Sequence, residues 1–250
     1  MVDTFERLVA EADAVDVSGW DFSWLDGRAT EERPPWTYQR SMSRRMATAA
    51  RALDIQTGGG EVLAGAAPLA PNTVATESWP PNVRVAAERL EPLGVSVVEH
   101  DDATPLPFAD GAFDLVVSRH PVATNWAEVG RVLRRGGVFY SQQVGPRTSI
   151  ELTEYFLGPQ TGPQYRDPAL ARASAEAAGL EIVDLREARL RMEFFDIGAV
   201  VYFLRKVLWT VPDFTVDRYR DRLRDLHERI ARDGVFLAHS TRFLIDAVKR

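Results

Sequence analysis

The sequence predicts an α/β protein with a mostly parallel, doubly wound sheet and helices on both faces. Three observations support this class: short apolar runs alternate with segments of helical periodicity, the runs are apolar enough for strands covered on both sides, and glycines follow the first run. Ligands bind such sheets beyond the carboxyl ends of the strands, near the point where strand order reverses. Functional residues are therefore expected at those ends.

The expected strands are short and recur along the chain. Seven are predicted, at residues 50–55, 73–76, 95–98, 113–118, 138–144, 180–194 and 235–245. A helix is expected to begin at Pro80, where a missing N–H costs little. Another is expected over residues 123–133, with Gly136-Gly137 ending it. This alternation of strands and helices is typical of a parallel sheet.

We expect a single domain of three parts. Residues 1–49 form an N-terminal helical cap, residues 50–191 and 234–250 form the ligand-binding core, and residues 192–233 form a helical insertion on the substrate side. Within the core, Thr148 and Glu151 have the spacing of a capping box, which predicts a short helix there.

Composition excludes several kinds of chemistry. The 250 residues include no cysteine, which removes disulfides, thiolate metal sites and cysteine nucleophiles. The histidines show no metal-ligand spacing, so no metal is expected. A formal net charge of −6 disfavours nucleic acid, although Arg40, Arg44 and Arg45 can form a local basic patch. No apolar segment is long enough to span a bilayer, and we expect a cytoplasmic protein.

Glycines and acids follow three successive strands. The run Gly58-Gly59-Gly60 lies between a strand and a helix, where glycine lets a ligand approach the main chain. Glu77 ends the second strand and can accept hydrogen bonds from a ribose diol, and Asp102 follows the third. A plain tight turn and two solvated loop acids are the alternative. The coincidence of all three favours a nucleotide site.

Four stretches, "LDIQTGGGEVL", "ATESWPP", "DATPLPFADGAFDLVVS" and "EVGRVLRRGG", resemble the class I S-adenosylmethionine-dependent methyltransferases. That resemblance implies a Rossmann-like, seven-stranded sheet. Asp54, Gly58 and Gly60 match the first motif of the family, whereas Gln56 stands where the family has its first glycine. Two further stretches, "SGWDFSWLDGRATEERPPWTYQR" and "FFDIGAVVYFLRKVLWTVPDF", resemble a bacterial subgroup of type 11-like methyltransferases.

The resemblance also implies which residues bind the cofactor, S-adenosyl-L-methionine. Besides the first motif, Glu77 is expected to bind the ribose hydroxyls, Asp102 the adenine amino group, and the N–H of Ala103 the adenine ring. Trp79 is expected near the nucleoside, with burial at a helix start as the alternative, and Ser118 belongs to the same cofactor set. Gln56 is expected either to narrow the methionine pocket or to add an amide hydrogen bond there.

The substrate side is expected beyond the fourth strand. His120 is the candidate general base, with simple packing before Pro121 as the alternative. Arg119 either binds an acidic substrate or the cofactor carboxylate, or makes a surface ion pair. Aromatic residues near the start of the chain either line an apolar pocket or seal the sheet: Trp20, Phe22, Trp24, Trp36 and Tyr38.

The function predicted is SN2 methyl transfer to a small-molecule acceptor by a monomer or homodimer. Three alternatives remain open at this point. A nicotinamide oxidoreductase fits the glycine turn and Glu77, although the glycine spacing does not give G-x-G-x-x-G. A non-catalytic nucleotide-binding module fits Gln56 and the lack of a definite base. RNA methylation is the weakest alternative because the chain is acidic.

Overall fold

The computed structural model describes residues 3–17, 21–161 and 164–250. It divides into two compact units. The core unit comprises residues 34–146, 163–188 and 242–250, and the second unit comprises residues 1–33, 147–162 and 189–241. The segment 1–49, expected as one cap, is thus divided after residue 33, and residues 147–162 group with the second unit.

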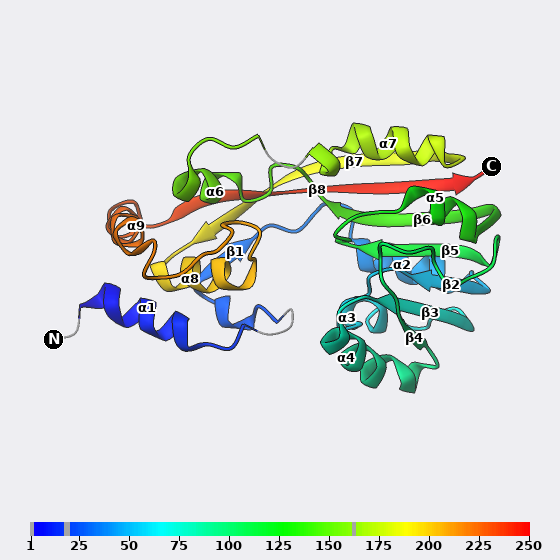
Figure 1. The fold of residues 1–250 in the computed structure, drawn as a ribbon, viewed down its shortest axis with the longest axis horizontal. Helices are drawn as coiled ribbons and strands as arrows, with labels where there is room; N and C mark the ends of the chain where they lie inside the picture. Colours follow the sequence, from blue (N-terminus) through cyan, green and yellow to red (C-terminus); the bar gives the residue numbers. More distant parts are fainter. Residues whose placement is uncertain (1–2, 18–20, 162–163) are drawn as a thin grey trace. The chain divides into compact units, whose positions relative to one another are not determined.

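A mostly parallel sheet forms the core unit (Figure 1). Its parallel strands lie in the order β4-β3-β2-β5-β6, with β8 antiparallel to β6 and β7 beyond β8. The strand order reverses between β2 and β5, because β3 and β4 lie on one side of β2 and β5 on the other. The strands are β2 (Arg51–Asp54), β3 (Asn72–Glu77), β4 (Ser96–Glu99), β5 (Phe113–Arg119), β6 (Leu133–Val144), β7 (Leu180–Phe194) and β8 (Phe236–Lys249).

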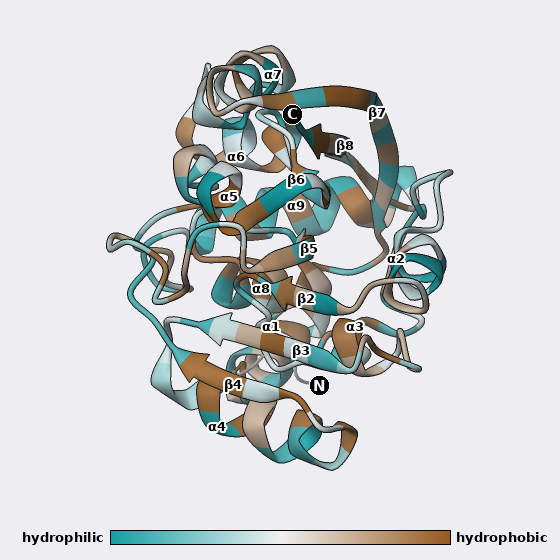
Figure 2. Ribbon diagram, turned by 90° about the vertical axis from the view of Figure 1, so that its right-hand side faces the viewer, coloured by the Kyte–Doolittle hydropathy of each residue, from teal (hydrophilic) through white to brown (hydrophobic). Residues whose placement is uncertain are grey.

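Helices cover both faces of this sheet, as Figure 2 also shows. Neighbouring residues of each strand point to opposite faces, so Ala52 packs in one apolar cluster and Leu53 in the other. The first cluster includes residues of α2 (Tyr38–Met46), α3 (Glu61–Ala64) and α4 (Pro80–Leu90), and the second includes residues of α5 (Trp126–Val132) and α7 (Pro168–Ala177). The short 3-10 helices of this unit are η2 (Glu91–Leu93) and η3 (Gln164–Arg166).

The position of Gly136-Gly137 corrects one expectation about where α5 ends. The helix ends at Val132, and the strand begins at the next residue, so Gly136-Gly137 lies inside β6 instead of ending α5. The pairing register of β5 and β6 shifts between Phe113 and Leu115, and Gly136 has a φ of 73°. An irregular strand can contain an extra residue in a left-handed, turn-like conformation, and the end of a helix often does too. Glycine favours that conformation, so both structures give the same local sequence signal.

The second unit is a helical layer packed on the remaining parts of β7 and β8. Its core cluster joins residues of α1 (Thr4–Ala14), α6 (Ile150–Leu157), α8 (Ile197–Lys206) and α9 (Arg220–Asp233). Every residue of α8 except Arg205 is buried, as its apolar sequence predicts. The unit also contains η1 (Ser23–Leu25) and β1 (Ala29–Glu31), which pairs antiparallel with β7.

Two expectations in this unit are wrong. The described strands number eight, because the three-residue β1 was not predicted. The capping box also does not form. Ser149 precedes α6 in a left-handed conformation. Thr148 Oγ1 accepts from Thr241 N–H, and the Glu151 carboxylate accepts from His239 Nδ1. Within the described part of the chain, no helix is long and apolar enough to cross a membrane.

Candidate functional site

In the loop after β2, every second residue from Gln56 to Gly60 has a left-handed backbone conformation. Gln56, Gly58 and Gly60 have φ values of 57°, 65° and 79°. Glycine adopts this conformation without strain, whereas a residue with a Cβ does not. A Cβ at Gly60 would lie 2.9 Å from Leu90 Cδ1, so close packing against α4 already requires a glycine there.

Gln56 stands in the left-handed position where the resembled family has glycine. Its side-chain Oε1 accepts from Val122 N–H at 2.7 Å, and its Nε2 donates to Ala123 O at 2.9 Å. The amide therefore ties the loop after β2 to the loop after β5. These two hydrogen bonds offset the strain of the left-handed backbone.

Glu77 is fixed beside the glycine loop. Its Oε2 accepts from Gly58 N–H at 2.8 Å, and its Oε1 accepts from the N–H groups of Ser78 and Trp79 at 3.1 and 3.0 Å. The residue is 6% exposed. A carboxylate offers about four acceptor positions, and three are occupied here, so its orientation is strongly determined.

The segment after β4 lies next to Glu77. His100 N–H donates to Glu77 O at 3.0 Å, and the Ser78 side chain counteracts part of the effect of burial on the pKa of Asp102. Burial raises the pKa of the Asp102 carboxyl above its ordinary value. Ala103 N–H donates to Asp101 Oδ1 at 3.0 Å within the turn. Hydrogen bonds therefore join Gly58 to Glu77 and Glu77 to His100, two residues before Asp102, at the carboxyl ends of β2, β3 and β4.

Trp79 is not buried at its helix start. It directly precedes α4, and 48% of its surface is exposed although its main-chain N–H donates to Glu77. An exposed indole next to a fixed carboxylate offers a flat apolar surface for stacking.

Asp54 and Ser118 lie behind this loop and contact the chain itself. Asp54 Oδ2 accepts from Thr57 Oγ1 at 2.7 Å, and burial raises the pKa of Asp54 to about 7. Ser118 Oγ donates to Ile55 O at 2.8 Å. Asp114 lies at the other end of β5, where it accepts from the N–H groups of residues 50 and 51 and holds the start of β2.

His120 also has a left-handed backbone, with a φ of 58°. Its Nε2 lies 2.8 Å from Gln142 Nε2, and Gln142 Oε1 accepts from Trp36 Nε1 at 2.7 Å. Burial, with the nearby charges of Arg119, Arg242 and Arg166, lowers the pKa of His120 well below its usual range. Tyr38 donates to Ser118 O at 3.0 Å, so both predicted substrate-side aromatics reach the end of β5 or β6.

A cavity of about 30 Å³ lies where these segments meet. Side chains from the ends of β2 and β5 and from the segment after β4 line it, among them Ile55, Asp102, Leu106, Ser118 and Pro121. Three stretches far apart in sequence thus converge at the reversal point of strand order, where ligands bind in such sheets.

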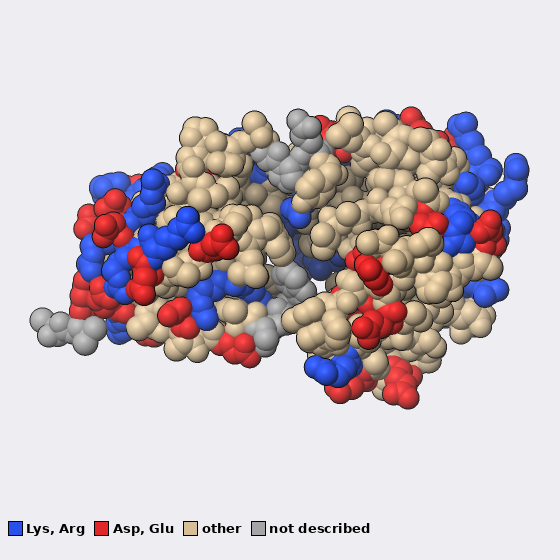
Figure 3. Space-filling view, viewed as in Figure 1, with Lys and Arg blue, Asp and Glu red and all other residues tan. Residues whose placement is uncertain are grey.

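Two of the other predicted aromatics belong to the second unit. Phe22 and Trp24 pack in the second unit, where Trp24 stacks on Tyr202 at 4.9 Å between ring centroids. Trp20 lies outside the described residues. The proposed basic patch is also reduced, because Arg45 pairs with Asp246 and lies over the Tyr140 ring at 4.4 Å. Figure 3 shows basic and acidic side chains interspersed on the visible face.

Several residues at the site were not predicted. Gln142 lies 22 residues from His120 and 106 from Trp36, so its contacts had no local signal. Thr57 and Ser78 each stand next to a predicted residue, and the Thr57 hydroxyl and the Ser78 main-chain N–H make the supporting hydrogen bonds. In the described part of the chain, no group of three or more His, Asp or Glu residues is arranged to hold a metal ion.

Comparison with known proteins agrees with this fold. Residues 53–141 match a family model described as a methyltransferase domain, which is less than half of the chain. No curated protein sequence matches the chain.

Three solved structures show the same fold. A candidate methyltransferase from Bacillus halodurans C-125 is 19% identical, with a TM-score of 0.59 over 84% of this chain and 98% of its own. A geranyl diphosphate methyltransferase in complex with S-adenosylmethionine is 12% identical, with a TM-score of 0.52 over 85% and 84%. The [4+2]-cyclase SpnF is 20% identical, with a TM-score of 0.53 over 84% and 80%.

The fold is that of the class I S-adenosylmethionine-dependent methyltransferases, as the sequence motifs predicted.

Proposed function

We propose that this protein transfers a methyl group from S-adenosyl-L-methionine to a small-molecule acceptor by SN2 displacement. Two hydrogen bonds carry the proposal, because they bring three strand ends together: Gly58 N–H donates to the Glu77 carboxylate, and His100 N–H, two residues before Asp102, donates to Glu77 O. Two carboxylates and an open main-chain turn at that place suit the ribose, the base and the linking atoms of one nucleoside.

The residues present fit such a cofactor. Glu77 would bind a ribose hydroxyl at its remaining acceptor position, and Asp102 would accept from the adenine amino group. The exposed indole of Trp79 would stack near the nucleoside. Ala103 would offer its N–H to the base only if it gave up Asp101, to which it donates here.

The remaining predicted cofactor residues would support the loop. Asp54 holds Thr57, Gln56 ties the loop to residues 122 and 123, and Ser118 holds residue 55. Gly58 and Gly60 give the loop its left-handed turns. These contacts fix the geometry before any ligand arrives, which reduces the cost of binding.

The chemistry asked of this chain is mainly alignment. The bound cofactor supplies a methyl group on an electrophilic sulfonium. The protein must hold the acceptor in line with that methyl group and keep water out, and good alignment is worth about 7–11 kcal/mol. The ends of β5 and β6, with Arg119, His120, Trp36 and Tyr38, would form the acceptor side.

The alternatives are separable by ligand binding. A nicotinamide dinucleotide would also use Glu77, but the glycines at 58, 59, 60 and 65 do not match its fingerprint. A binding module without chemistry would keep cofactor affinity and lack turnover. The likeness to a cyclase means that methyl transfer itself must be measured as well as binding.

The test compares thermal unfolding with S-adenosylmethionine, S-adenosylhomocysteine, NAD and NADP. At a hundred times the Kd, a ligand adds about 2.7 kcal/mol, which is roughly a 5–10 °C rise in Tm for a chain of this size. We expect that rise with the sulfonium cofactor and its product only. A rise with NAD or NADP instead would contradict the proposal, as would no methyl transfer to any member of a broad acceptor panel.

A further inference from the structure

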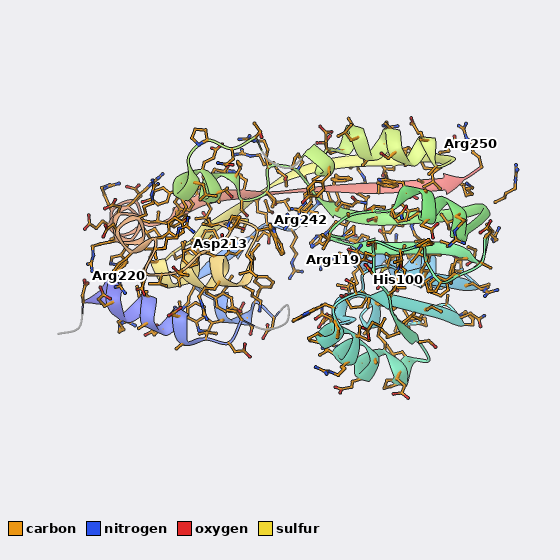
Figure 4. The ribbon with its side chains drawn as sticks, in the orientation of Figure 1. His100, Arg119, Asp213, Arg220, Arg242 and Arg250 are labelled. Atoms are coloured by element: carbon orange, nitrogen blue, oxygen red, sulfur yellow. The ribbon has the colours of Figure 1, made fainter. Side chains whose placement is uncertain are left out.

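Two arginines and a histidine gather at the carboxyl end of β5. Arg119 is the last residue of β5 and pairs with Gln142 of β6, and His120 follows it. Two residues beyond Gln142, Val144 pairs with Arg242 of β8. Paired residues of adjacent strands, and residues two apart, project to the same face. Arg119 and Arg242 therefore flank Gln142, and Figure 4 shows both at this end of the core-unit sheet.

The hydrogen bonds of Gln142 determine which nitrogen of His120 carries the proton. Trp36 Nε1–H can only donate, so the oxygen of the Gln142 amide must face it. The amide nitrogen then faces His120 Nε2 at 2.8 Å and donates to it. An imidazole that accepts at Nε2 is neutral and carries its proton on Nδ1. His120 is thereby set as a hydrogen-bond donor through Nδ1.

A third arginine approaches from η3. Arg166 acts electrostatically on His120 together with Arg119 and Arg242. Its Nε is buried, and within the described residues it has no hydrogen-bond partner. A buried donor without a partner costs free energy, which an anionic ligand would recover. Arg119 and Arg242 each have another interaction within the chain, but a guanidinium has five N–H groups and can bind more than one partner.

We propose that Arg119, Arg166, Arg242 and the Nδ1–H of His120 bind an oxyanion, a carboxylate or a phosphate, on the methyl acceptor. We call this set the arginine–histidine cluster. That the oxyanion belongs to a methyl acceptor rests on the proposed function, whereas the anion site rests on these residues alone. Arginine forks match the geometry of both oxyanions.

The proposal changes the role expected of His120. With its Nε2 lone pair held by Gln142 and its Nδ1 protonated, the imidazole has no free lone pair to take a proton from the acceptor. It instead donates to the oxyanion and orients it beside the methyl group. Deprotonation by His120 is not part of this arrangement.

The test uses nuclear magnetic resonance of the imidazole nitrogens in the full chain with S-adenosylhomocysteine present. Inorganic phosphate and acetate are added separately, at ionic strength matched with sodium chloride. The variants are Arg166→Gln and Arg119→Gln. The control is Arg44→Gln, an exposed arginine on α2 of the same unit.

We expect the His120 proton on Nδ1, and a saturable shift of its resonances with phosphate or with acetate but not with chloride. Whichever anion shifts them identifies the oxyanion class. Affinity should fall about tenfold to a hundredfold in Arg166→Gln and Arg119→Gln and stay unchanged in Arg44→Gln.

A proton on Nε2, no saturable shift with either anion, or equal affinities in all three variants would overturn the proposal. Binding of the anion by a protein that does not bind S-adenosylhomocysteine would leave the cluster established and remove the methyltransferase assignment. Cofactor binding without anion binding would do the opposite, so the two failures are distinguishable.

Discussion

Gly58 N–H donates to Glu77 Oε2 at 2.8 Å, although the two residues are 19 positions apart in the sequence. The contact joins the end of β2 to the end of β3, its neighbour in the sheet. It holds a buried carboxylate against the only stretch of three consecutive glycines in the chain. The proposed cofactor site is built around this contact.

Gly60 is expected to be intolerant of a side chain for two reasons that a matched variant separates. Gly60→Ala places a Cβ in a left-handed residue and 2.9 Å from Leu90 Cδ1, whereas Gly94→Ala has a φ of 75° and open space around it. We expect Gly94→Ala to cost about 1–2 kcal/mol of unfolding free energy from strain alone. Gly60→Ala should cost about 1–3 kcal/mol more from overpacking. Urea denaturation measures both, and equal losses would contradict the packing argument.

Gln56 is expected to balance strain against two hydrogen bonds. Gln56→Gly removes the left-handed strain, about 1–2 kcal/mol, and loses two hydrogen bonds of about 1 kcal/mol each, so its stability should stay close to that of the wild type. Gln56→Ala keeps the strain and loses the hydrogen bonds, and should lose about 2 kcal/mol. The denaturation midpoints should therefore fall in the order wild type, Gln56→Gly, Gln56→Ala. An alanine variant as stable as the glycine variant would show that the backbone is not strained.

Asp54 is expected to make stability depend on pH. Its pKa is raised to about 7 in the folded protein and is 3.8 in the unfolded reference. The folded state therefore favours the protonated form, so this contribution is fully present below about pH 4 and is lost as pH rises through about 7. Asp54→Asn should flatten the curve and gain on the order of a few kcal/mol relative to the wild type at pH 8.

The control for that measurement is Glu88→Gln, an exposed carboxylate on α4 of the same unit. It should leave the pH dependence of the unfolding free energy unchanged. If wild type and Asp54→Asn gave parallel stability curves between pH 4 and 8, Asp54 would not be the titrating group.

Trp36 is expected to control the protonation site of His120 from a distance. Trp36→Phe removes the donor that fixes the Gln142 amide, so the amide can reverse and accept from His120 instead. The nitrogen resonances of His120 should then show a mixture of Nδ1–H and Nε2–H forms. Trp126→Phe alters an edge-on contact with Phe139 and should leave them unchanged. An unaltered single tautomer in Trp36→Phe would contradict the orientation argument.

Features that depend on local sequence were predictable. The long strand β7 has the predicted bounds, and Pro80 begins α4, because apolar runs and a helix-start proline act through neighbouring residues. The proximity of Glu77 to the glycine loop was also predictable, since adjacent parallel strands end at the same edge of a sheet.

Features that depend on distant partners were not predictable. Glu151 was predicted to cap a helix. Its carboxylate instead binds Arg189 and His239, which lie on strands far along the chain. Gly136 was predicted to end a helix, because a glycine after a helical segment commonly does so. In the structure its left-handed conformation instead belongs to an irregular strand, which favours glycine equally. The role of Gln142 required knowing that Trp36 and His120 lie on either side of it.

Calorimetric titration with S-adenosylhomocysteine tests the central claim most directly. The wild type and the control Glu88→Gln should bind it with equal affinity. Glu77→Gln, which replaces an acceptor oxygen with a donor, should bind about tenfold to a hundredfold more weakly while keeping its circular dichroism spectrum. A wild type that does not bind this ligand, or a Glu77→Gln variant that binds it as tightly as the wild type, would contradict the account.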